Sequence, residues 1–395
     1  MSDSITGDGV PLAFKVLQGQ DRSSVLADCQ GRDVFKVEAR HLVGHQREAI
    51  VTEGASGSAW RVTSDEGVHL KGTDLAPFPF GFFNAGLQGD LLHRIRSGAA
   101  AGGIVLDGLE IQLDNEYWLT GSFALGTGQG HAEPTQIEVK VHSGISDEAI
   151  SNLVTAAIAA SPAMALLRTP LTNTFALYVN GRRRAAAGVA NSTAPDARDP
   201  FAVYQSAPRP LHAESARQDL IEKTGRRQEG AAALAPAGTT TRIVRRVKGK
   251  GRLADPAGCT EIETWLELPG MSHFTFRTDE GDLGGGPSGL ALLSAGVAFC
   301  YLTQLARYIE HMKLPIRGAR LVQYSPYALA AGPSGGALTA IAGNIDTHLF
   351  LNGEAPDATH ANLLMIAART CYLHATAAAV LPPRLCLVHN GVRVI

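Results

Sequence analysis

The sequence predicts an α+β protein made of two tandem copies of one unit, each a mainly antiparallel sheet with two central helices. The first reason is an internal repeat, in which the second half matches the first at an offset of 210 residues, as Pro287 matches Pro77. The second reason is a period-two alternation of apolar and charged residues, which is typical of half-buried strands. The third is a long apolar segment with helical spacing.

The repeat covers most of both halves of the chain. AGL at 85–87 matches AGV at 295–297, and the Asn-Gly pair at 180–181 matches the pair at 390–391. Upstream, WRVTSDEG resembles FTFRTDEG at an offset of 214. Agreement in both hydrophobic pattern and turn residues indicates a duplication.

The duplication predicts the division of the chain. We expect one copy at residues 12–184 and the other at 240–395. The segment 185–239 between them begins with a stretch rich in Ala, Pro and Ser, which is linker composition. Its AESARQDLIEKTG stretch, at 213–225, predicts a short polar helix.

The elements of the second copy follow in order from its sequence. Residues 260–268 alternate and predict a strand, and a Pro-Gly turn leads into a second strand at 273–277. The Gly-rich segment 281–289 then connects this hairpin to a helix that is apolar nearly all round and is therefore expected to be buried. This helix is expected to end near Lys313, before Pro315.

Two strands, a second helix and a final strand complete the copy. ARLVQY and DTHLFL predict the two strands, and Asp357 is the expected N-cap of the second helix. The basic segment RIVRRVKGKGR at 242–252 also alternates, and we interpret it as a solvated strand edge.

Composition and charge exclude several functional classes. The net charge of −2 leaves no basic excess, so neither nucleic acid nor a membrane is an expected partner. The polar N-terminus is unlike a signal peptide, and no apolar run approaches the roughly 20 residues of a membrane span. Because the five cysteines are few and irregularly spaced, we expect a cytoplasmic protein with reduced thiols.

Two of the cysteines lie in apolar helical segments of the second copy. Cys300 belongs to the long buried helix, and Cys371 lies near the C-terminal end of the second helix. The other three, Cys29, Cys259 and Cys386, lie in loops or in the final strand. Inert packing is one interpretation of the helical pair, since free cysteine is among the most buried residue types.

The segments around these two cysteines resemble the OsmC/Ohr family (osmotically inducible protein C and organic hydroperoxide resistance proteins). The similar segments are GGGPSGLALLSAGVAFCYLTQLARY and HANLLMIAARTCYLHATA. The resemblance implies that Cys300 is a peroxidatic cysteine and that Cys371, in the CYLH segment, is the resolving one. It also implies a strand-rich α+β unit and an intimate dimer with active sites at the interface.

The first copy keeps the frame of this family but not its cysteines. Asp90 takes the position of Cys300, and Ser161, followed by Pro162, takes that of Cys371. The resemblance therefore implies a dimer fused into one chain, an intrachain pseudo-dimer with one working and one vestigial site. Asp90 is expected to cap or pair structurally, and a second use is as a polar group in a remodelled pocket.

The sequence departs from the family at a glutamate that holds the activating arginine. Leu290 occupies that position in the second copy, and Phe80 occupies it in the first. The candidates for an arginine near Cys300 in the second copy are Arg242, Arg245, Arg246, Arg252 and Arg277.

Three functions fit these residues. The first is a thiol peroxidase that reduces an organic hydroperoxide through Cys300 and Cys371 and is restored by a dithiol reductant. The second is a hydrolase or lyase, with Cys300 as nucleophile on a carbon electrophile and His374 as base. The third is a protein that only binds a small molecule.

The substrate in the enzyme hypotheses is a small apolar organic molecule, and no cofactor is expected. A metal site is not expected either, because Cys371 and His374, with His360 or His389, offer no second close pair of ligands. Further dimerisation of the fused pair is open.

Overall fold

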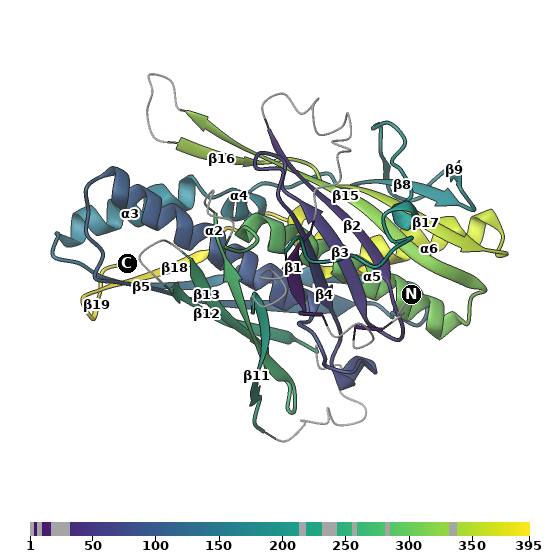
Figure 1. The fold of residues 1–395 in the computed structure, drawn as a ribbon, viewed down its shortest axis with the longest axis horizontal. Coiled ribbons are helices and arrows are strands. Elements are labelled where there is room, and N and C mark those ends of the chain that lie inside the picture. The colour runs from purple at the N-terminus through teal and green to yellow at the C-terminus, as the bar shows by residue number, and fades with distance from the viewer. Residues whose placement is uncertain are drawn as a thin grey trace.

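Two large sheets with helices packed between them form the protein, as the computed structural model shows (Figure 1). The structure describes residues 4–5, 10–16, 32–212, 219–230, 243–254, 259–280, 285–331 and 338–395.

The first sheet has the strand order β1-β4-β3-β2-β15-β17-β8-β10, with β16 paired to β15 and β9 paired to β8. Its strands are β1 (Ala13–Lys15), β2 (Asp33–His41), β3 (Arg47–Thr52), β4 (Ala59–Ser64), β8 (Thr174–Val179), β9 (Arg182–Arg184), β10 (Ala190–Asn191), β15 (Ile316–Ala331), β16 (Leu338–Ala342) and β17 (Asp346–Gly353).

The second sheet has the order β11-β14-β13-β12-β5-β7-β18-β19, with β6 paired to β5. Its strands are β5 (Gly108–Thr120), β6 (Gln129–Ala132), β7 (Gln136–His142), β11 (Ile221–Arg227), β12 (Arg245–Leu253), β13 (Thr260–Leu266), β14 (Ser272–Thr278), β18 (Arg384–His389) and β19 (Val392–Arg393).

The two sheets have the same strand order once each strand is replaced by its counterpart in the other copy. Strands β1 to β4 of the first sheet correspond to β11 to β14 of the second. Strands β15, β17 and β8 correspond to β5, β7 and β18. Each sheet therefore joins strands of both copies. The joints are antiparallel, between β2 and β15 and between β12 and β5, whereas β8 and β18 lie parallel to their neighbours β17 and β7. This confirms the α+β fold with two mainly antiparallel sheets, and neither copy forms a sheet alone.

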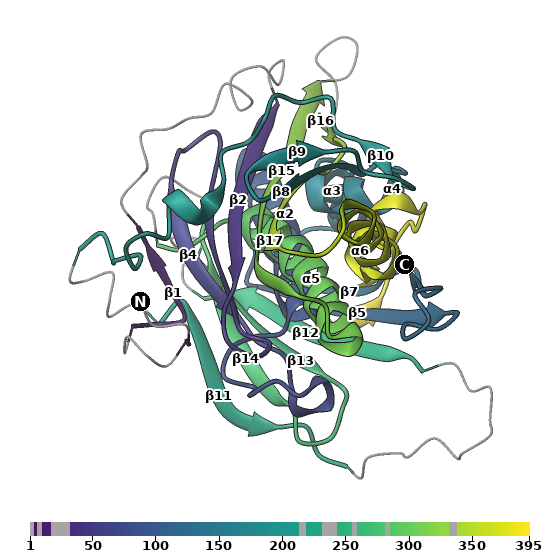
Figure 2. The same ribbon diagram turned by 90° about the vertical axis from the view of Figure 1, so that its right-hand side faces the viewer.

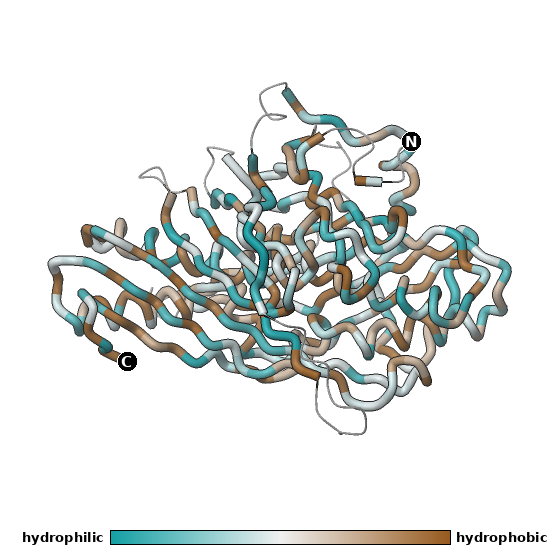
Figure 3. The backbone as a smooth tube through the Cα atoms, turned by 90° about the horizontal axis from the view of Figure 1, so that it is seen from below, coloured by the Kyte–Doolittle hydropathy of each residue, from teal (hydrophilic) through white to brown (hydrophobic). Residues whose placement is uncertain are grey.

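The alternation of buried and more exposed side chains along a strand shows which face of the sheet packs on the core. Buried and half-buried side chains alternate along nearly the whole of β5, and Figure 3 shows hydrophilic and hydrophobic residues alternating along the long strands. One face of the second sheet at β5 therefore packs on the helices while the other is half-buried and more polar, whereas β2, β3 and β4 of the first sheet are buried on both faces.

The helices cover the inner faces of the sheets. They are α2 (Pro79–Ala101), α3 (Asp147–Ala159), α4 (Pro162–Arg168), α5 (Gly289–Met312), α6 (Asp357–Thr370) and α7 (Tyr372–Ala378), with 3-10 turns η1 (Val68–Leu70) and η2 (Pro200–Ala202). α5 packs on β2 and β15 of the first sheet, and α2 packs on β12 and β13 of the second. The two long helices also pack against each other at the centre (Figure 2).

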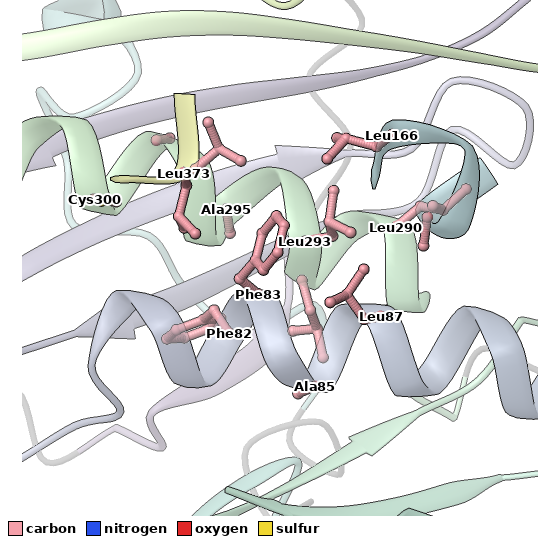
Figure 4. Packing of buried hydrophobic residues seen from close by; sticks show 14 of the residues in the cluster. Phe82, Phe83, Ala85, Leu87, Leu166, Leu290, Leu293, Ala295, Cys300 and Leu373 are labelled. Carbon is pink, nitrogen blue, oxygen red and sulfur yellow. The ribbon is translucent and has the colours of Figure 1, made fainter. Parts of the chain in front are cut away.

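Glycines allow these two helices to approach closely. A Cβ atom on Gly86 would lie 2.5 Å from the backbone nitrogen of Leu293, and one on Gly296 would lie 2.8 Å from that of Phe83. The repeated Ala-Gly pair of the sequence is therefore the contact between α2 and α5, which lie side by side in Figure 4.

Three expectations about local structure are wrong. The stretch expected as a polar helix contains the strand β11, which lies in the segment expected as a linker. β11 pairs with β14 of the second sheet. The basic segment contains β12, which is no edge because it pairs on both sides. Asp357 is the first residue of α6, and Pro356 is its N-cap.

The long helix of the second copy has the extent that the sequence predicts. α5 ends at Met312, and Lys313 is its C-cap. By length and composition α5 could cross a membrane, but its apolar stretch is entirely buried inside the protein. Its hydrophobicity on all sides is that of a central core helix.

Candidate functional site

A small pocket opens above Cys300, between residues of the two copies. The first copy supplies Glu66 and Phe80 to its lining, and the second supplies Cys300 and Tyr372. The pocket has a volume of about 60 Å³. That is several times the roughly 15 Å³ that one water molecule needs, so a small organic group fits.

Cys300 lies in the middle of α5 and is 1% exposed. Its sulfur has hydrogen bonds with the backbone N–H of Leu373 and with the Cys371 side chain, and Leu373 lies beside Cys300 in Figure 4. Burial and the neighbouring Cys371 raise the pKa of the Cys300 thiol well above its ordinary value. The thiol is therefore protonated at rest unless a nearby group takes its proton.

Cys371 lies at the junction of α6 and α7, where it ends one helix and caps the next. Its Sγ lies 3.2 Å from Nδ1 of His374, and it also accepts the backbone N–H of His374. Burial raises the pKa of Cys371, but the hydrogen bonds with Cys300 and His374 outweigh burial and hold that pKa well below the ordinary value. The first thiolate of the pair thus forms on Cys371.

A buried arginine from the first copy lies close enough to Cys300 to interact with it electrostatically. Arg47, on β3, is completely buried, and its Nη1 lies 3.8 Å from Oε1 of Glu66, just after β4. Burial lowers the pKa of Arg47, whereas the negative charges of Glu66, Asp65 and Cys300 oppose that effect. Among the residues that the structure describes, Nε and Nη2 of Arg47 have no hydrogen-bond partner. Cys300, Cys371, Arg47 and Glu66 are called the cysteine site below.

The arginines expected from the sequence have different positions. Arg245 lines the pocket. Arg246 pairs with Glu116 and Arg252 with Glu261 at the surface, and Arg277 is exposed, while Arg242 lies outside the described residues. Leu290 packs in the core.

The sequence reasoning missed Arg47, Glu66 and Arg307. Arg307 follows Cys300 by two turns of α5 and lines the pocket. Glu66 belongs to the DEG segment that the repeat shares, so its recurrence was a visible signal. Nothing in the sequence around Arg47 indicates that it is buried, since arginine is rarely buried without a partner.

The corresponding place in the first copy contains oxygen in place of sulfur. Oδ2 of Asp90 accepts the hydroxyl of Ser161 and, at 3.1 Å, the N–H of Ala163, while Oδ1 lies 3.3 Å from Nε of Arg94. Burial raises the pKa of Asp90, and burial together with the charge of Asp90 raises the pKa of Glu280 to about 8. Asp90, Ser161, Arg94 and Glu280 are called the Asp90 site below.

The histidines considered as metal ligands do not converge. His374 contacts Cys371, His389 pairs with Asp147 at 2.6 Å, and His360 contacts the carbonyl of Pro356. In the part of the chain that the structure describes, no group of three His, Cys, Asp or Glu side chains is placed to hold a metal ion.

Comparison with known proteins gives one structural likeness. No protein-family model matches the chain, and no curated protein matches it. Among solved structures, an OsmC-like hydroperoxide resistance protein from Jannaschia sp. CCS1 is similar at 20% identity, over 38% of this chain and 96% of its own, with a TM-score of 0.26. This distant similarity concerns structure and leaves the chemistry to the residues of the site.

Proposed function

We propose that the protein is a two-cysteine thiol peroxidase that reduces an organic hydroperoxide with Cys300 and Cys371. The observation that carries the proposal is the interaction of the Cys371 side chain with Cys300, which lines a pocket, near a buried arginine whose Nε and Nη2 are without a hydrogen-bond partner among the described residues. A reactive sulfur, a resolving sulfur and a cation for the departing oxygen are the parts that this chemistry needs.

The first step uses the proton shared by the two thiols. Cys371, whose thiolate is stabilised by His374, takes the proton of Cys300 through their hydrogen bond. The Cys300 thiolate then attacks the terminal peroxide oxygen, so that an S–O bond forms, the O–O bond breaks and an alkoxide leaves. The alkoxide takes up the proton that Cys371 received and departs as an alcohol, so that Cys300 becomes a sulfenic acid and Cys371 is a thiolate again.

The second step closes a disulfide. The Cys371 thiolate attacks the Cys300 sulfur, so that the S–S bond forms and the S–O bond breaks, and the departing hydroxide takes a proton from solvent to leave as water. The two side chains interact across the α5–α7 packing, which favours a step with little movement of these helices. An external dithiol then restores both thiols by exchange.

Arg47 and Glu66 replace the missing glutamate of the long helix. Because Leu290 is apolar, it cannot hold an arginine, but Glu66 pairs with Arg47 from outside that helix. Thr303, on α5 one turn after Cys300, donates its hydroxyl to Glu66 at 2.7 Å and fixes the carboxylate. The free N–H groups of Arg47 would stabilise the Cys300 thiolate and the alkoxide.

The position of His374 favours the peroxidase over a hydrolase. A hydrolase with Cys300 as nucleophile needs a base within hydrogen-bond distance of that sulfur. His374 instead contacts Cys371, with Nε2 at 3.4 Å from the hydroxyl of Thr347. Its place suits stabilisation of a resolving thiolate.

The test is the intact mass of the reduced protein after one equivalent of cumene hydroperoxide. We expect the loss of two hydrogens, with a Cys300–Cys371 disulfide in the peptide map. Cys371→Ser should gain oxygen on Cys300, because the sulfenic acid has no resolving partner. Cys300→Ser should show no change.

Cys386→Ser is the matched control, because Cys386 is a half-buried thiol on β18 outside the pocket. It should form the same disulfide as the parent. An unchanged mass in the parent protein, with all thiols still countable, would overturn the proposal.

A further inference from the structure

The pocket above Cys300 contains two guanidinium groups without a carboxylate partner. Arg245 begins β12 and Arg307 lies on α5, and both line the pocket together with Cys300. Within the described residues neither arginine takes part in an ion pair, although the four other cationic side chains of β12 all do. The two cations therefore line the pocket, and Glu66 acts on both of them from beyond ion-pair distance.

Arg307 is held in place by uncharged groups. Its guanidinium lies over the ring of Phe123, 4.2 Å from the ring centre, and Nη1 donates to Oε1 of Gln304 at 2.8 Å. A guanidinium fixed in this way keeps its remaining N–H groups for a ligand at little cost in side-chain entropy.

The other ionisable groups of the pocket do not cancel this charge. Glu66 is the one carboxylate in the lining, and it is already engaged by Arg47 and Thr303. His69 is neutral at pH 7, because burial and the two arginines lower its pKa to about 4. The pocket therefore has a positive excess next to the thiol, and such partly desolvated cations favour an anionic partner.

We infer that Arg245 and Arg307 form a carboxylate-binding subsite, so that the substrate is a small organic acid that carries its reactive group a short chain away. The apolar side chains of Leu70, Phe78, Phe80 and Leu266 also line the pocket and suit that short chain. The hydroperoxide part of the substrate rests on the proposed function, but the carboxylate subsite does not. This refines the apolar substrate expected from the sequence.

Calorimetric titration with butanoate and with butanamide tests the subsite without any thiol chemistry. The two probes have nearly the same shape and differ in charge. We expect butanoate to bind at least tenfold more tightly than butanamide, with an affinity that falls as salt is added. Equal binding of the two probes, or no binding of butanoate at millimolar concentration, overturns the inference.

Neighbouring arginines on β12 give a matched pair of variants. Arg245→Gln should lower the affinity for butanoate at least tenfold, and Arg307→Gln should do the same. Arg246→Gln should leave it unchanged, because Arg246 points to the surface and pairs with Glu116 at 2.8 Å. A loss of affinity in Arg246→Gln equal to that in Arg245→Gln would mean that overall charge, not the subsite, attracts the anion.

A second arm separates this inference from the peroxidase proposal. The rate of thiol oxidation is measured with a hydroperoxide of a short carboxylic acid and with that of its methyl ester. We expect kcat/KM at least tenfold higher for the acid, and Arg245→Gln should remove the preference. Butanoate binding without oxidation by either compound would keep the subsite and overturn the peroxidase, whereas equal oxidation without butanoate binding would do the reverse.

Discussion

The cysteine site and the Asp90 site occupy corresponding places in the two copies and share one backbone frame. In the first, Cys300 accepts the N–H of Leu373, and Cys371 accepts that of His374. In the second, the N–H groups of Ala163 and Met164, which correspond to Leu373 and His374, point in the same way to Asp90 and Ser161. The frame thus offers two amide donors to whichever acceptors the long helix and the helix junction present.

What differs is the buried cation. In the first copy Arg47 pairs with Ser64 across the sheet. In the second copy Thr278 corresponds to Ser64, and it pairs with Thr260, which therefore takes the place of Arg47. The hydroxyl of Thr260 contacts that of Thr278. The Asp90 site therefore has no fully buried arginine, and Arg94 approaches Asp90 from the half-exposed side of its helix. A carboxylate can remain there because it is able to take up a proton, as its raised pKa indicates. The comparison shows that the donor frame is common to both sites, whereas the proposed redox chemistry depends on side chains present only in one.

The largest expected difference between the sites concerns activity. Cys300→Ser should lower the rate of hydroperoxide reduction at least about a thousandfold, since it removes the nucleophile. Asp90→Asn should leave the rate within about threefold, because a change at a separate site is nearly independent. Steady-state rates with cumene hydroperoxide measure both. Equal losses would show that the two sites work as one unit.

Removal of the buried cation should have the next largest effect. Arg47→Met leaves Glu66 buried without its charged partner, and we expect a loss of about 3 kcal/mol in the free energy of unfolding. Arg94→Met should cost less than about 1 kcal/mol, because Arg94 is partly exposed and Asp90 keeps two other donors. Urea unfolding compares the two variants.

Activity provides a second measure of Arg47. Arg47→Lys keeps the charge but not the planar fork, so we expect it to restore stability better than activity. If Arg47→Met and Arg94→Met lost equal stability, the burial of Arg47 would have no special energetic role.

A substitution that disturbs the close contact between α2 and α5 should lower stability by a smaller amount. Gly86→Ala places a methyl group against the backbone of Leu293, which cannot yield as a side chain can, and we expect a loss of about 2 kcal/mol. Gly98→Ala, at an exposed position of the same helix, meets only the end of the flexible Leu153 side chain, 3.0 Å from the added Cβ, and should be close to neutral. Thermal unfolding measures both. A stable Gly86→Ala variant would contradict the close packing of α2 on α5.

Local patterns explain why much of the fold could be predicted from the sequence. The hairpin of β13 and β14 and the helix α5 follow from alternation and helical spacing, which are properties of one segment. The exchange of strands between copies could not be predicted, because alternation fixes which face of a strand is buried and not which strand lies beside it. β11 was missed since most of its side chains are exposed and polar, as suits an edge strand.

The residues of the cysteine site also differ in whether the sequence could indicate them. Cys300 and Cys371 could be proposed as site residues from the sequence because each lies within or at the end of a continuous helical segment. Arg47 comes from a strand of the other copy, 253 residues from Cys300 (300 − 47), so no local pattern connects them. The residues around Arg47 on β3 have the pattern of an ordinary strand. The charge of Arg47 is buried because each sheet combines strands of both copies, which the local sequence does not indicate.

The smallest expected effect is a pH dependence that belongs to the Asp90 site. Glu280 faces Asp90, Glu53 and Arg94, and its pKa is raised from 4.5 to about 8. Between these values the folded state keeps a proton that the unfolded chain has released, so stability is full below pH 4.5 and falls as the pH rises to about 8. We expect Glu280→Gln to lose about 1–2 kcal/mol less than the parent between pH 6.5 and pH 8. Urea unfolding at both pH values measures this, with Glu222→Gln on the exposed face of β11 as the control. Parallel losses in the parent and Glu280→Gln would mean that Glu280 is ionised throughout, and the two sites would then differ in their sulfur chemistry but not in how they hold a proton.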